Sequence, residues 1–169
     1  LARLGLDKLA HGAVDFSPGA GPRLVRLPNL PPFRPLICYE IIFPREISVS
    51  TSDDNAEWLL NLTNDAWFGD NFGPHQHLAI ARIRAVEMGL PVVRAANTGI
   101  SAVIDPFGRI TSQLPMAAVG IIDSNLPMAL PETLYRRFGD GIFALLCLFL
   151  AGLIIQRHHG RRDAAHGEL

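Results

Sequence analysis

The sequence predicts an α/β layered domain, and three features support this fold class. Short apolar runs of the kind found in buried strands end in polar or turn-forming residues. Residues 75–88 carry apolar side chains at helical spacing, and residues 105–108 have the composition of a tight turn. Strands, one amphipathic helix and a tight turn together indicate a sheet with a helix packed on it.

The first predicted strand leads directly into Cys38, within the segment Pro35-Leu-Ile-Cys-Tyr-Glu-Ile-Ile-Phe-Pro44. Leu36 and Ile37 are apolar, and the chain must turn before Pro44. We therefore expect the Cys38 thiol at a fixed strand end beside a backbone N–H, which is where a nucleophile would be placed. A buried cysteine that packs as a small hydrophobic residue also fits this spacing.

The next strand is expected at residues 56–62, and the polar turn Thr63-Asn64-Asp65 follows it. A strand that ends in Asn and Asp places these side chains at a sheet edge or in a cleft. There they can cap turns or meet a ligand.

The predicted helix over residues 75–88 has Pro74 near its first turn, and Gly89 and Pro91 stop it. In the turn that follows, Asp105, Pro106 and Gly108 occupy positions that a type I turn favours, so we expect it to join two antiparallel strands. Further strands are expected at residues 92–96, 100–104 and 119–122.

Residues 141–155 form an uncharged apolar run of fifteen residues, followed by a basic tail. As a helix this run would cover about 22 Å, less than the roughly 30 Å of a bilayer core, so spanning would require flanking residues to snorkel. The alternative is a buried core or interfacial helix. That alternative is awkward because the whole circumference of the helix is apolar and needs covering.

Composition narrows the possible partners. The hydrophobic content of 49% and the mean hydropathy of +0.22 favour a membrane contact. The net charge is −1 and Lys8 is the only lysine, so a nucleic-acid partner is not expected. His75 and His77 lack a third ligand at useful spacing, so we expect neither a metal nor a cofactor.

Three motifs resemble known proteins. The triplet Cys38-Tyr39-Glu40, which follows an apolar strand, resembles the nucleophile motif of the nitrilase superfamily. The segments Asn64-Asp-Ala-Trp-Phe-Gly69 and Arg94-Ala-Ala-Asn-Thr-Gly-Ile-Ser101 resemble its apolipoprotein N-acyltransferase branch. The motifs occur in the family's order, and the resemblance runs from residue 1 to about Arg157.

The resemblance implies a partial nitrilase-like αββα sandwich followed by one C-terminal transmembrane helix. It assigns residues 1–128 to the C-terminal part of the catalytic domain, 129–140 to a connector, 141–156 to the transmembrane helix and 157–169 to a basic cytoplasmic tail. It also implies a protein of the bacterial inner membrane with its catalytic domain in the periplasm.

The activity implied by the resemblance is acyl transfer. Cys38 would take an acyl chain from a membrane phospholipid as a thioester and pass it to the free amine of a diacylglyceryl-cysteine lipoprotein. The family's Glu base and its Lys precede the cysteine in the family's order, and Lys8 lacks the surroundings of that lysine. The chain is therefore expected to hold one of the three triad residues.

Other candidate site residues have alternative roles. Tyr39 supplies a backbone N–H suited to an oxyanion, and Glu40 is expected to support the turn in preference to acting as a base. Asn64 and Trp67 are candidates to line the acyl or headgroup pocket, with turn capping and core filling as the alternative. Two rival functions remain: a nitrilase-type amidase that hydrolyses a small C–N substrate, and an inactive membrane-anchored fragment.

Overall fold

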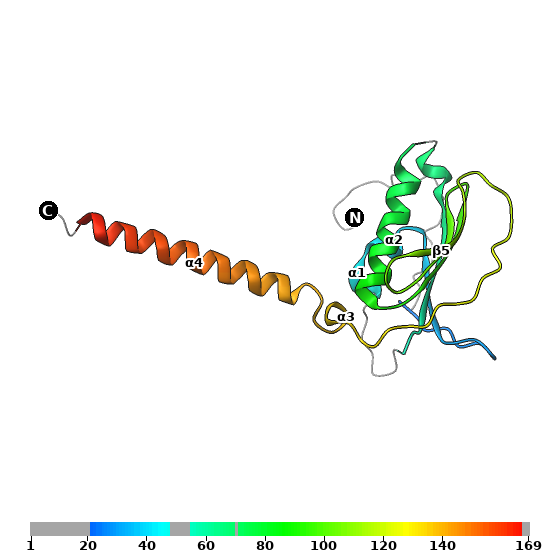
Figure 1. Ribbon diagram of the computed structural model, residues 1–169, viewed down its shortest axis with the longest axis horizontal. Helices are drawn as coiled ribbons and strands as arrows, with labels where there is room; N and C mark the ends of the chain where they lie inside the picture. Colours follow the sequence, from blue (N-terminus) through cyan, green and yellow to red (C-terminus); the bar gives the residue numbers. More distant parts are fainter. Residues whose placement is uncertain (1–20, 48–54, 70, 167–169) are drawn as a thin grey trace, which may run out of the picture.

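The computed structural model describes residues 21–47, 55–69 and 71–166, so the predictions for residues 1–20 and 167–169 lie outside the described residues. The strands are β1 (Phe33–Ile37), β2 (Trp58–Asn64), β3 (Val92–Asn97), β4 (Ser101–Ile104) and β5 (Ile110–Leu114). The helices are α1 (Pro44–Ile47), α2 (Gly73–Met88), α3 (Leu134–Phe138) and α4 (Gly141–His166), with 3₁₀ turns η2 (Cys38–Ile42) and η3 (Asp65–Phe68) (Figure 1).

The five strands form one mixed sheet in the order β1-β2-β3-β4-β5. The first three strands are parallel to one another, while β4 and β5 pair antiparallel. The carboxyl ends of β1, β2 and β3 therefore lie side by side at one edge of the sheet. Ligands of α/β proteins bind at such an edge.

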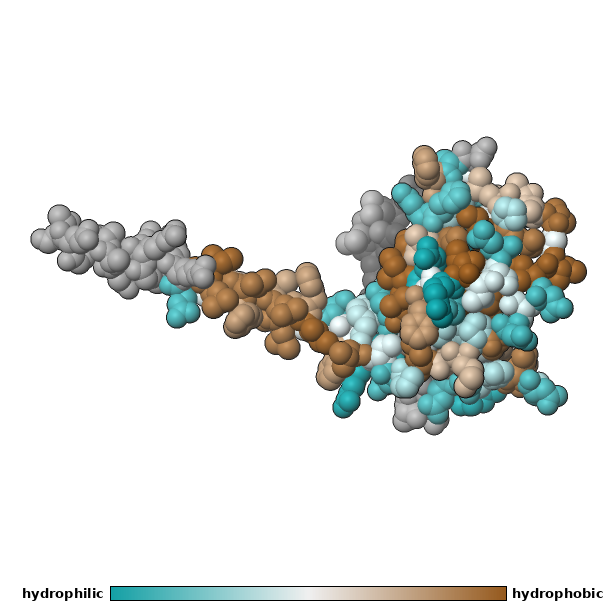
Figure 2. Space-filling view, in the orientation of Figure 1, coloured by the Kyte–Doolittle hydropathy of each residue, from teal (hydrophilic) through white to brown (hydrophobic). Residues whose placement is uncertain are grey.

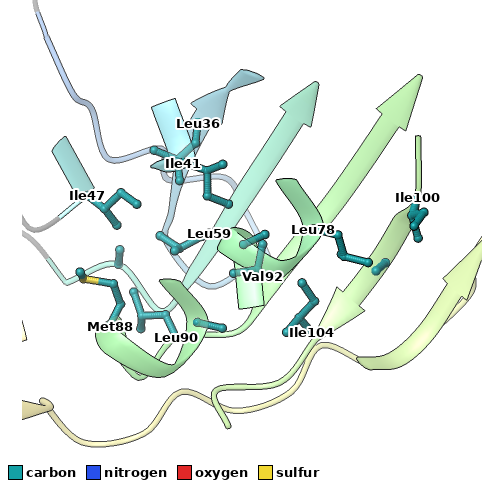
Figure 3. Packing of buried hydrophobic residues seen from close by; sticks show 14 residues of the cluster. Leu36, Ile41, Ile47, Leu59, Leu78, Met88, Leu90, Val92, Ile100 and Ile104 are labelled. Carbon is teal, nitrogen blue, oxygen red and sulfur yellow. The ribbon is translucent and has the colours of Figure 1, made fainter. Parts of the chain in front are cut away.

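Helix α2 and the turn η2 cover one face of the sheet and enclose the core (Figure 3). Alternate strand residues point into this core, as the twofold repeat of a strand requires. Burial of each large apolar side chain contributes about 1.5–3 kcal/mol. The fully buried members include Ile41, Leu59, Ala81, Ala85, Val92, Ala102 and Ile104.

The opposite face of the sheet is partly bare within the described residues. Ile37, the last residue of β1, is 55% exposed, and Leu62, its neighbour on β2, is 41% exposed on this face. The described chain thus supplies a helix layer and one sheet. This agrees with the expectation of a partial sandwich.

The observed limits of α2 agree closely with the helix predicted over residues 75–88. It begins at Gly73 with Pro74 in its first turn and ends at Met88, and Gly89 follows in the left-handed conformation with φ of 65°. The backbone N–H of Gly89 bonds the carbonyl of Ala85. Glycine adopts this conformation without steric cost, which explains why the helix ends there.

The predicted turn at residues 105–108 is also present. The N–H of Gly108 donates to the carbonyl of Asp105 at 2.9 Å, and the Asp105 carboxylate accepts from the N–H groups of Phe107 and Arg109, both at 2.9 Å. The turn joins the antiparallel strands β4 and β5, as expected.

The strand predicted at residues 119–122 is wrong. The chain leaves the sheet after β5, and Ala117, with φ of 60°, donates its N–H to the carbonyl of Thr98 at 2.9 Å. Val119 and Ile121 are 104% and 91% exposed. Among the described residues no strand pairs with this segment, and pairing decides strand formation more than propensity does.

Helix α4 extends away from the α/β layers, and its described apolar side chains are exposed along its length (Figures 1 and 2). Its apolar run ends at Ile155, and Gln156 and Arg157 follow. No helix in residues 21–47, 55–69 and 71–166 combines the length and the apolar character needed to cross a bilayer, in contrast to the span expected over residues 141–156.

Candidate active site

Cys38 lies at the junction between β1 and η2. Its φ is +51°, in the left-handed region that residues with a Cβ rarely adopt. The side chain is half-buried. Such strain at a sharp strand-to-helix turn presents a side chain at the carboxyl edge of the sheet, and it persists only where the surroundings hold it.

Glu40 holds the turn from within. Its Oε2 accepts the backbone N–H of Ile37 at 2.6 Å, and its carbonyl accepts the N–H of Phe43 at 3.1 Å. Both bonds close the chain tightly around Cys38. The Glu40 carboxylate therefore anchors the turn locally, through the backbone N–H of Ile37.

Asn61 holds the same turn from the neighbouring strand. Its Nδ2 donates to the carbonyl of Leu36 at 3.2 Å and to the carbonyl of Cys38 at 3.3 Å. The side chain is completely buried, at 0% exposure. The amide therefore ties β2 to both sides of the last residue of β1.

Arg94 is buried beneath these residues. Its Nη1 donates to Oδ1 of Asn61, and its Nη2 donates to Oδ2 of Asp65 at 2.6 Å. Its Nε donates to the carbonyl of Ile100 at 3.2 Å. Removing one partner of a buried ion pair typically costs about 3–5 kcal/mol because the other charge is left uncompensated.

Asp65 lies at the end of β2 and joins Arg94 to α2. Its Oδ1 accepts the hydroxyl of Thr63 at 3.1 Å and lies 3.0 Å from Nδ1 of His77. The same Nδ1 lies 3.2 Å from Nη2 of Arg94. The carboxylate is the closer partner and can only accept, so the proton belongs on Nδ1 of His77.

The pKa values of the buried groups reflect this environment. Burial lowers the pKa of His77 from 6.5, although its hydrogen bond to Asp65 and the backbone of Cys38 act to raise it. Burial also lowers the pKa of Arg94, while the charge of Asp65 and its hydrogen bond, and then Cys38, act to raise it.

Aromatic rings surround His77 on the side of Cys38. The Tyr39 ring stacks on the imidazole with centroids 5.6 Å apart, and the Phe68 ring meets it edge-on at 5.7 Å. These contacts fix the imidazole and exclude water from it. The Tyr39 side chain is itself 48% exposed, at the mouth of the site.

The two predicted pocket residues lie further out. Oδ1 of Asn64 accepts the N–H of Ala66 at 3.2 Å, which caps η3, and the side-chain amide of Asn97 at 2.9 Å. Trp67 is 84% exposed. Neither side chain contacts Cys38 through a hydrogen bond or ring contact recorded among the described residues, and a pocket role for them stays a prediction.

The sequence alone does not mark Asn61 and Arg94 as site residues, and it offers His77 only as a possible metal ligand. Asn61 and Arg94 each interrupt an otherwise apolar strand, in Leu-Leu-Asn-Leu and Val-Val-Arg-Ala. A polar residue at a buried strand position needs a partner, and this signal points to the network. Among the described residues, no group of three or more His, Cys, Asp or Glu side chains is arranged to hold a metal ion.

The sequence of this chain is similar to those of known proteins. The apolipoprotein N-acyltransferase of Rhodopseudomonas palustris is 46% identical over 157 residues, which is 93% of this chain and 29% of the relative. The Bradyrhizobium diazoefficiens protein of the same name is 45% identical over 162 residues, 96% of this chain and 30% of the relative. The chain thus spans about three-tenths of the length of these curated relatives.

A solved structure is also similar. A cysteine-to-alanine variant of a Nesterenkonia amidase from the nitrilase superfamily matches with a TM-score of 0.49 and 24% identity, over 60% of this chain and 40% of the amidase. The carbon-nitrogen hydrolase family matches residues 16–134. The predicted resemblance to the nitrilase superfamily and its apolipoprotein N-acyltransferase branch is confirmed, and the chain belongs to the carbon-nitrogen hydrolase family.

Proposed function

We propose that this chain carries the nucleophile of an apolipoprotein N-acyltransferase. The observation that supports the proposal most directly is the strained turn at Cys38, held by Asn61 and Glu40 at the carboxyl edge of three parallel strands. The identity of about 45% to proteins of that name, over most of the chain, supports the choice of reaction.

The first step is attack of the Cys38 thiolate on an ester carbonyl of a phospholipid. A carbon–sulfur bond forms, the ester carbon–oxygen bond breaks, and the lysophospholipid leaves as an alcohol after it receives a proton. The backbone N–H of Tyr39 stabilises the oxyanion of the tetrahedral intermediate. The product on the enzyme is an acyl thioester.

In the second step the free α-amine of a diacylglyceryl-cysteine lipoprotein attacks the thioester carbonyl. An amide bond forms, the attacking nitrogen gives up one proton to the family's Glu base, and Cys38 leaves as the thiolate, which restores the enzyme. The Glu base and the Lys of the family act in both steps, and neither is assigned to a residue of this chain. Glu40 supports the turn, while Asn64 and Trp67 line the entrance used by the lipid substrates.

The reaction takes place at the bacterial inner membrane, on its periplasmic side. Both substrates are held in lipid, so an enzyme attached to the same surface meets them without extracting them. Helix α4 places apolar side chains such as Phe143, Leu148 and Ile154 in contact with lipid, and each of these is more than half exposed. The proposal includes a crossing of the bilayer by α4, helped by residues on either side of its apolar run, with the basic tail over residues 157–169 on the cytoplasmic side; the described residues alone provide no such span.

Mass spectrometry tests the proposal. The full-length protein that contains these 169 residues is incubated with phospholipid, digested and searched for an acyl adduct. We expect the adduct on the peptide with Cys38, no activity in Cys38→Ala, and retained activity in the matched Cys147→Ala variant. An adduct confined to Cys147, or hydrolysis of small amides without lipid acylation, would contradict the proposal.

A further inference from the structure

We propose that Arg94 is a positioning residue that acts on Cys38 through Asn61, so that one buried guanidinium fixes the backbone of the nucleophile turn. The inference rests on the proposed function, since it takes Cys38 as the nucleophile. Neither Arg94 nor Asn61 touches the reacting atoms in this role.

The orientation of the Asn61 amide is the first step. A guanidinium can only donate hydrogen bonds, so the contact from Arg94 Nη1 requires the oxygen of Asn61 to face Arg94. The amide nitrogen must then face the other way, where it meets the carbonyls of Leu36 and Cys38 at 3.2 and 3.3 Å. Arg94 therefore selects the orientation in which Asn61 can hold the turn.

Arg94 is itself fixed in place by several partners. Its Nη2 donates a hydrogen bond to Oδ2 of Asp65 at 2.6 Å, and its Nε donates one to the carbonyl of Ile100 at 3.2 Å. The side chain is 2% exposed, so water offers no substitute for these bonds. A lysine at this position would keep the charge but could not bond Asn61, Asp65 and Ile100 together, because it lacks the planar fork.

A double-mutant cycle in the full-length protein tests this inference. The variants are Asn61→Ser, Arg94→Lys and the double variant, with Arg82→Lys as the matched control. Arg82 also donates its Nε to a backbone carbonyl, that of Gly108 at 2.7 Å, but it lies on α2 next to the β4–β5 turn. Single-turnover formation of the Cys38 thioester is measured at several phospholipid concentrations, on protein whose folded fraction is known from thermal unfolding.

We expect each single variant to form the thioester at least tenfold more slowly, with the half-saturating phospholipid concentration changed less than twofold. The double variant should form the thioester only slightly more slowly than either single variant, because both changes interrupt the same chain of hydrogen bonds from Arg94 through Asn61 to Cys38. Arg82→Lys should stay within twofold of the wild type. Multiplicative losses in the double variant, or folded Arg94→Lys with the wild-type rate, would overturn the inference.

Alkylation of Cys38 by iodoacetamide separates this inference from the proposed function, because it needs no lipid. We expect at least threefold slower alkylation in Asn61→Ser and Arg94→Lys and no change in Arg82→Lys. If lipid acylation is absent in the wild type but the alkylation rates differ as expected, the proposed function fails and the positioning role stands. Equal alkylation rates in all folded variants would overturn the positioning role.

Discussion

Gly99 lies directly against Asp65: a Cβ atom on Gly99 would be 2.2 Å from Oδ2 of that carboxylate. Real Cβ atoms do not approach other atoms so closely, so any side chain here must displace Asp65. Oδ2 is the atom that accepts Nη2 of Arg94. The loop between β3 and β4 and the buried ion pair therefore fit together only with glycine at this position.

Gly99→Ala is expected to destabilise the protein by about 1–3 kcal/mol, the usual cost of overpacking, and to slow thioester formation. Thermal unfolding and single-turnover assays of the full-length protein measure the two effects. Gly141→Ala is the matched control, since nothing lies within 4 Å of the added Cβ there. Equal stability of the two variants would mean that Asp65 can move without a loss of folding stability.

Glu40 is the next test, because its Oε2 accepts the N–H of Ile37 at 2.6 Å. Glutamine keeps an acceptor oxygen but cannot act as a base, whereas alanine removes both functions. If Glu40 supports the turn, Glu40→Gln should retain most of the rate and Glu40→Ala should lose both rate and about 1 kcal/mol of stability. A rate in Glu40→Gln as low as that in Glu40→Ala would instead assign proton transfer to Glu40.

His77 should make stability depend on pH. Burial lowers its pKa from 6.5, so below about pH 6.5 the unfolded chain binds a proton more readily than the folded protein. Stability is therefore present above this pH and falls as the pH decreases, by at most about 1.4 kcal/mol per pH unit for one proton. The groups that face His77 are Asp65, Arg94, the backbone of Cys38 and the rings of Tyr39 and Phe68.

Thermal unfolding of the full-length protein between pH 5 and 8 measures this dependence. His77→Gln should flatten the decrease at low pH, while His75→Gln, an exposed neighbour on the same helix, should leave the slope unchanged. Identical slopes in wild type and His77→Gln would assign the effect to another group.

Helix α4 gives a test of the proposed lipid contact. Leu148 is 69% exposed on this helix, and an arginine at the centre of a membrane helix costs about 2.5–3.5 kcal/mol on insertion scales. In a Cys147→Ala background with Ala164→Cys, we expect Leu148→Arg to make the tail cysteine accessible to a membrane-impermeant maleimide outside the cytoplasm. Leu148→Ala should leave the cysteine protected. Equal labelling of all three proteins would place α4 outside the membrane.

The elements near the site were predictable because their signals are local. The apolar residues before Cys38 define the end of β1, and Pro74 and Gly89 delimit α2. The strand over residues 119–122 was predicted wrongly, since its residue types favour a strand but none of the described strands pairs with it. Propensity alone does not reveal that absence.

The buried network was not predictable in the same way. Arg94 lies 33 residues from Asn61 and 29 from Asp65, and His77 lies 12 residues from Asp65. A sequence shows that Arg94 stands in an apolar strand but not which groups compensate its charge. Only the parallel order of β1, β2 and β3 brings these partners together.

The parallel order also makes the nucleophile geometry a late product of folding. The bonds from Asn61 to Leu36 and Cys38 join residues 25 and 23 positions apart, and neither can form within a hairpin. Closing such loops costs entropy before any contact offsets it, so these pairings form slowly. During synthesis the strained turn at Cys38 has only the local support of Glu40 until β2 has paired, and the support of Asn61 is itself unfixed until Arg94 has left the ribosome. More than fifty further residues are therefore synthesised after Cys38 before its thiol is held in the native position. This delay consists of the 23 residues from Cys38 to Asn61 and the 33 residues from Asn61 to Arg94.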